Sequence, residues 1–117
     1  MHTAHQTAVL LVMTLKASGQ NRARISGTTL RFLGRRQKLR SAFVHQVTGH
    51  MAELGWTLVE LPGVGYGALQ TDTLTAAKTV TAKKWLAPEI LRQVRSGNVD
   101  FIALELQLDV NFEPEEE

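Results

Sequence analysis

The sequence predicts an α+β domain in which three helices precede a β-hairpin. Apolar residues recur at steps of three and four between residues 39 and 54, and the period changes to two after Gly55. A glycine follows or ends each helical pattern, at positions 19, 34 and 55, where helices commonly stop. The length of 117 residues, of which 44% are hydrophobic, is that of one ordinary domain that buries roughly two-thirds of its unfolded surface.

The first expected helix covers residues 4–17. Thr3 is a suitable N-cap, the segment contains no Gly or Pro, and Lys16 complements the dipole at the C-terminal end. Residues 9–15 are apolar most of the way round the helix, which predicts burial on more than one side or a place in a dimer interface. A very short strand is expected next, over residues 22–25.

Two further helices follow in quick succession. Small and hydroxyl-bearing residues from Ser26 favour a helix start, and Gly34 favours its end. The third expected helix covers residues 40–54, with Gly55 just beyond it. Its amphipathic stripe advances by 4, 4, 4 and 3 residues through Leu39, Phe43, Val47, Met51 and Leu54.

A β-hairpin is expected after Gly55. Residues 56–61 alternate as a half-buried strand does, residues 62–65 form a turn, and residues 66–71 return as the second strand. The glycine-rich run 63–67 has neither a following helix nor a βαβ context, so it is a turn and not a phosphate-binding loop.

The C-terminal part is less regular. Residues 72–84 are expected to be irregular or partly helical, and residues 87–94 form a short helix with a proline in its first turn. Residues 99–110 are expected to be a strand, because Leu104, Leu106, Leu108 and Val110 alternate. Residues 111–117 are expected to be an acidic, flexible tail.

Charge is strongly segregated along the chain. Residues 1–52 hold eight basic residues and no acid, whereas residues 53–117 hold all eleven acids and five bases. Seven of the eight N-terminal bases fall between Arg22 and Arg40, and from Ser96 onward there are seven acids and no base. Runs of charge are often only solvated surface, but the absence of any N-terminal acid favours an anion-binding face.

The order of these elements resembles that of the winged helix-turn-helix superfamily over residues 4–72. The resemblance implies a winged-helix-like core of three helices plus a hairpin wing. With the C-terminal helix and strand as an extension of this core, residues 1–110 are expected to form one domain. It also implies that the third helix enters the major groove of double-stranded DNA and that the wing tip, residues 62–65, touches the backbone or the minor groove. Because the tip has no Lys or Arg and Glu60 stands near it, a wing contact is expected through backbone amides or packing.

The candidate DNA-binding residues follow from this arrangement. Phosphate contacts are expected from the basic residues just before the third helix: Arg31, Arg35, Arg36 and Lys38. Base or phosphate contacts are expected from outward-facing residues of the helix itself: Arg40, Ser41, His45, Gln46 and Thr48. Arg40 suits guanine and Gln46 suits adenine. The expected function is therefore double-stranded DNA binding, and the expected biological role is transcriptional regulation.

Enzyme, cofactor and metal functions are not expected. Cys is absent, and the histidines at positions 2, 5, 45 and 50 lack the spacing of a helical metal pair. No nucleophile elbow or triad pattern is present, and Gln107 occupies the lysine position of a nuclease-like E-x-K arrangement beside Glu105. The longest apolar stretch, residues 8–13, is far shorter than the ~20 residues of a membrane span, so a cytoplasmic protein without membrane contact is expected.

Other interpretations remain open at this level. The chain is alternatively a protein-interaction module, such as an inhibitor or adaptor, that acts through its acidic C-terminal end. A third hypothesis is that the acidic end folds back on the basic segment and weakens nonspecific DNA binding. Attraction to phosphate is common to DNA and RNA, and a homodimer through the first helix or the strand at 99–110 is a further hypothesis.

Overall fold

The structure, a computed structural model, describes residues 1–112. It has an α+β fold, as predicted, with helices and one three-stranded antiparallel sheet. The chain forms two compact units, Met1–Ala77 and Lys78–Glu117, which are described separately below. Most of the expected flexible tail, residues 113–117, lies outside the described residues.

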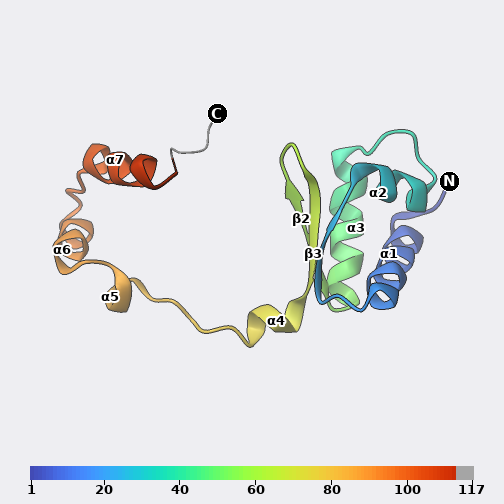
Figure 1. Ribbon diagram of the computed structural model, residues 1–117, viewed down its shortest axis with the longest axis horizontal. Coiled ribbons are helices and arrows are strands. Elements are labelled where there is room, and N and C mark those ends of the chain that lie inside the picture. The colour runs from blue at the N-terminus through green and yellow to red at the C-terminus, as the bar shows by residue number, and fades with distance from the viewer. Residues whose placement is uncertain (113–117) are drawn as a thin grey trace. The chain divides into compact units, whose positions relative to one another are not determined.

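The first unit contains the predicted order of elements (Figure 1). They are α1 (Ala4–Ser18), β1 (Arg22–Ile25), α2 (Gly27–Gly34), α3 (Ser41–Glu53), β2 (Trp56–Leu61), β3 (Gly65–Gln70) and the short α4 (Thr71–Thr75). From α1 to β3, each boundary lies within one residue of the sequence-based prediction. This α+β arrangement is compatible with a winged-helix-like core.

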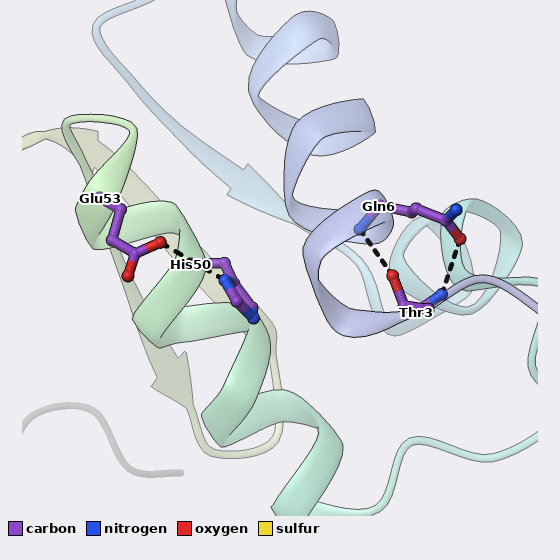
Figure 2. A network of polar contacts seen from close by, with 4 residues as sticks. All are labelled: Thr3, Gln6, His50 and Glu53. Carbon is purple, nitrogen blue, oxygen red and sulfur yellow. Dashed lines mark hydrogen bonds and ion pairs between the residues drawn. The ribbon is translucent and has the colours of Figure 1, made fainter.

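A capping box fixes the start of α1 (Figure 2). The Thr3 hydroxyl accepts a hydrogen bond from the Gln6 backbone N–H at 3.1 Å, and the Gln6 side-chain oxygen accepts one from the Thr3 N–H at 2.9 Å. These bonds satisfy N–H groups that would otherwise lack partners at a helix start. The helix ends at Ser18, and its C-cap Gly19 has a left-handed φ of 74°.

The core lies between α1, α3 and the inner face of the sheet. Helix α3 packs against α1 on one side and against β2 on the other. Phe43, Val47 and Met51 of the predicted stripe are buried, while Leu39 is half-buried and Leu54, the C-cap of α3, is exposed. Other large buried side chains include Leu11, Leu15, Ile25, Leu30, Trp56 and Leu58. Burial of the stripe leaves the opposite side of α3 in solvent.

Strand β3 is central in the sheet, in the order β1-β3-β2, with both pairings antiparallel. The hairpin turn closes with a 2.9 Å bond from the Val64 N–H to the Leu61 carbonyl, and Gly63 has a φ of 77°. A proline followed by a left-handed glycine is typical of a type II turn. Gly65 has a φ of 128°, and a Cβ there would lie 2.6 Å from the Ile25 carbonyl oxygen. The close approach of β1 to β3 therefore requires glycine at position 65.

The second unit is helical in its described part. It contains α5 (Ala82–Trp85), α6 (Pro88–Ser96) and α7 (Phe101–Phe112), so the short helix after residue 87 is confirmed. The prediction of a strand over residues 99–110 is wrong. The Asp100 carboxylate accepts a hydrogen bond from the Ala103 N–H at 3.2 Å, as an N-cap does. Alternating leucines among Ala, Glu and Gln suit a helix, and a strand here would have no partner in the described part of the unit to satisfy its backbone groups.

No helix in the described part of the chain is long and apolar enough to cross a bilayer.

Candidate nucleic-acid interface

The outward side of α3 forms one wall of a groove with a volume of about 670 Å³. Ser41, His45 and Thr48 line this wall, and Glu60 of β2 and Tyr66 of β3 line the wall opposite. The three α3 residues are spaced by four and three positions, which places them on one face of a helix. The structure thus brings together three of the five residues predicted to contact bases or phosphates from this helix.

A second hollow, of about 570 Å³, adjoins this groove. Arg31 of α2 and Lys38 of the α2–α3 connection line one side, and the hairpin tip from Gly63 to Gly65 lines the other. Both hollows share Glu60 and Tyr66. One surface therefore runs from α3 to the tip of the hairpin, and two residues with predicted phosphate contacts lie beside it.

The connection between α2 and α3 is held by a tight turn. Arg35 has a left-handed φ of 53°, and its N–H bonds to the Phe32 carbonyl at 3.1 Å. Gly34 is the last residue of α2 and is buried. A Cβ at Gly34 would lie 3.3 Å from both the Phe43 ring and the Thr7 hydroxyl. Glycine here allows α2 to pack closely on α1 and α3.

Arg36 lies apart from the groove. Its guanidinium carbon is 3.6 Å from the centre of the Phe43 ring, and Nη2 donates a 2.9 Å hydrogen bond to the His2 carbonyl. Its Nε is buried and has no hydrogen-bond partner in the described part of the chain. The structure therefore places this predicted phosphate-binding residue in a structural contact between the N-terminus and α3.

The remaining predicted residues are exposed. Arg40 is the N-cap of α3, and its side chain makes no capping hydrogen bond. Gln46 is exposed on α3 but lies outside both hollows. Arg35 lines a separate hollow between α2 and the start of α1, together with Phe32. Of the predicted residues, only Arg31, Lys38, Ser41, His45 and Thr48 line the two hollows described above.

The first unit is basic, but its candidate interface contains one carboxylate. The unit holds eight Lys and Arg residues and three acids, Glu53, Glu60 and Asp72. Glu53 is paired with His50, whose Nδ1 lies 3.5 Å from a carboxylate oxygen (Figure 2). Glu60 is the one acid that lines both hollows. A phosphate approaching the groove is thus attracted by Arg31 and Lys38 and repelled by Glu60.

Two other arginines lie elsewhere in the unit. On β1, Arg22 and Arg24 are exposed, whereas the alternate residues Ala23 and Ile25 pack on the core. Because side chains alternate along a strand, both arginines belong to the outer face of the sheet and not to the face that packs on α3. They line a smaller hollow of about 370 Å³ with Val59.

Sequence reasoning missed Tyr66 and Leu39 as parts of the candidate interface. The sequence predicts Tyr66 only as part of the returning strand, and Leu39 only as part of the core stripe. The alternation of the hairpin places Tyr66 on the same side of β3 as buried Ala68. The register that carries it to the groove depends on the pairing of β3 with β1 and β2.

In the part of the chain that the structure describes, no group of three His, Cys, Asp or Glu side chains gathers where it could hold a metal ion. The rings of His5 and His50 meet edge to face, with centroids 5.2 Å apart. This contact joins α1 to α3.

No family model matches the chain, and neither the curated proteins nor the solved structures contain a significant match.

Proposed function

We propose that the first unit is a winged-helix-like module that binds double-stranded DNA and that the protein is a transcriptional regulator. In this proposal α3 enters the major groove and the hairpin is the wing. The basic residues beside the wing, Arg31 and Lys38, and the exposed Arg40 contact phosphates or base edges. The observation that supports this proposal most directly is one continuous surface, in which the polar face of α3, two basic residues and the hairpin tip meet.

The chemistry of α3 supports this proposal. Ser41, His45 and Thr48 offer hydroxyl and imidazole groups of modest size, which suit contacts to base edges and phosphates. The Thr48 hydroxyl also donates to the Val44 carbonyl at 2.8 Å, so its remaining capacity is that of an acceptor. Gly49 is exposed and would have nothing within 4 Å of a Cβ, which leaves room for a close approach by a ligand backbone.

Duplex binding is tested by fluorescence anisotropy with a labelled random-sequence DNA duplex, titrated with salt. The test variant is Arg31→Gln with Lys38→Gln and Arg40→Gln. The matched control is Lys16→Gln with Arg22→Gln and Arg24→Gln. It also removes three positive charges, but from other parts of the first unit. We expect the log–log salt slope to fall by about 0.9 per lost phosphate contact in the test variant, with a smaller change in the control.

Three results would overturn the proposal. The first is an absence of binding by the parent protein at low salt. The second is an equal loss of affinity in the two triple variants, because that would indicate a response to net charge alone. The third is equal binding to an RNA duplex of the same length, since the major groove of A-form RNA is too narrow for a helix.

A further inference from the structure

The described part of the second unit does not cover its own large apolar side chains. Among residues 78–108, whose burial the structure describes, no side chain is buried. The exposed large apolar residues there are Val80, Trp85, Val94, Phe101, Ile102, Leu106 and Leu108. A folded unit is stabilised chiefly by removing such side chains from water. This unit therefore lacks a core of its own in its described part.

Helix α7 shows most clearly that the described part of the unit lacks a core. Ile102 and Leu106 lie four residues apart on one side of the helix, and Phe101 and Leu108 lie on another. Ile102 is 73% exposed and Leu106 is 61% exposed. A helix that is apolar on more than one side is normally covered by other protein. With twelve residues, α7 is too short to span a bilayer.

Contacts within the unit cover only part of this surface. The Asn98 N–H donates to the Gln93 carbonyl at 3.0 Å, and the Asp100 N–H donates to the Gln93 side-chain oxygen at 3.2 Å. These bonds fix the turn between α6 and α7 around Gly97, whose φ is 81°. Leu91 and Leu104 are half-buried. The turn is thus defined, but the apolar sides of α7 remain open.

The charge pattern of the second unit indicates what covers the apolar sides of α7. Residues 78–95 hold five bases and one acid, whereas the chain from Ser96 onward holds seven acids and no base. Two copies of this unit in an antiparallel arrangement place the basic part of each copy against the acidic part of the other. A twofold interface repeats each contact, so the favourable pairing occurs twice.

The first unit offers a poorer self-pairing surface. Two of its exposed apolar residues, Leu10 and Phe32, line one hollow together with Arg31, Arg35 and Arg36 and with no Asp or Glu. Twofold pairing through this patch would bring like charges together, which is unfavourable. The second unit is therefore the better candidate for contact between copies.

We infer that the second unit is a homodimerisation element in which α7 of one copy packs against α5 and α6 of a second copy. The apolar side chains of α7 supply the contact area, and the opposite charges of α6 and α7 set the antiparallel orientation. The inference does not depend on the proposed function. If the first unit binds DNA, pairing of two copies allows two half-sites to be read together.

The first test measures association of the full 117-residue chain by sedimentation velocity from about 1 to 100 μM, a range that brackets micromolar dimers. We expect a dimer whose dissociation constant rises at least about tenfold in the Ile102→Glu, Leu106→Glu double variant. The matched control, Met13→Glu with Phe32→Glu, adds two charges at exposed apolar positions of the first unit and leaves the dimer intact. Far-UV circular dichroism verifies that each variant keeps its fold.

The second test reverses the charges. One variant carries Arg92→Glu and Arg95→Glu, which makes α6 acidic, and the other carries Glu105→Lys and Asp109→Lys, which makes α7 basic. Each alone is expected to dimerise more weakly than the parent. An equimolar mixture is expected to form heterodimers, detected by native mass spectrometry, because each acidic helix then faces a basic one.

Several outcomes would overturn the inference. One is a monomeric mass across the whole concentration range. Another is a dimer that is lost in the Met13, Phe32 variant but retained in the Ile102, Leu106 variant, which would place the interface on the first unit. If the charge-reversed variants fail to form heterodimers on mixing, the pairing of α6 with α7 of the second copy is wrong.

Discussion

The guanidinium of Arg36 stacks on the ring of Phe43 at a distance of 3.6 Å. The same guanidinium donates a hydrogen bond to the carbonyl of His2, 34 residues away in sequence. Phe43 is buried in the core at the start of α3. A side chain from the α2–α3 connection thus holds the N-terminus and the candidate interface helix in one arrangement.

Replacing Arg36 with Ala is expected to lower the free energy of unfolding by about 1–3 kcal/mol. The loss combines a partly desolvated cation–π contact with a charged hydrogen bond. Urea denaturation measures it, and Arg35→Ala is the matched control because Arg35 is an exposed neighbour with the same charge. Equal effects of the two substitutions on stability would contradict a structural role specific to Arg36.

Truncation of the two phenylalanines in this region is expected to change stability by very different amounts. Phe43→Ala is expected to cost about 3–5 kcal/mol, as for a buried aromatic side chain that leaves a cavity. Phe32→Ala is expected to change stability by less than about 0.5 kcal/mol, since Phe32 is 77% exposed. Thermal denaturation of both variants compares them directly. A large loss in Phe32→Ala would show that α2 packs differently.

Two glycines provide a matched pair of substitutions. Gly65→Ala is expected to destabilise the first unit by about 1–3 kcal/mol or more, because position 65 has a positive φ and the added Cβ would meet the Ile25 carbonyl. Gly49→Ala lies on the exposed side of helix α3 with open space around it and is expected to stabilise by about 0.5–1 kcal/mol. Chemical denaturation gives both values. Tolerance of alanine at position 65 would contradict the close approach of β1 to β3.

Glu60→Gln is expected to tighten duplex binding by about 3- to 10-fold at low salt, because it removes a carboxylate that repels phosphate from both hollows. Anisotropy titrations at two salt concentrations measure the gain, which should shrink as salt rises. Glu53→Gln removes the same charge from the C-terminal end of α3, where Glu53 pairs with His50. A similar gain in both variants would mean that the duplex does not approach Glu60.

Much of the first unit could be predicted from local sequence. Thr3 before an apolar run predicts the start of α1, and the stripe through Phe43, Val47 and Met51 predicts the buried side of α3. The period of two after Gly55 predicts the hairpin. These signals are encoded by residues within a few positions of one another, so they can be read without the tertiary structure.

The wrong prediction of a strand over residues 99–110 also came from a local pattern. Leucines at every second position satisfy the pattern of a strand, but a strand is stable only beside a partner that pairs its backbone groups. The Asp100 N-cap and the helix-forming residues after it need no such partner. Period alone did not distinguish the two states, and α7 is the result.

The sequence by itself determined the order of elements from α1 to β3 and the concentration of positive charge in the first 52 residues. Only the tertiary structure decided which charged side chains lie beside the candidate interface. It placed Arg31 and Lys38 beside the hairpin, stacked the guanidinium of Arg36 on Phe43, and turned Arg22 and Arg24 to the outer face of the sheet. The physical reason is that helix periodicity and caps arise between neighbours in sequence, whereas the surroundings of a side chain depend on packing between segments far apart in the chain.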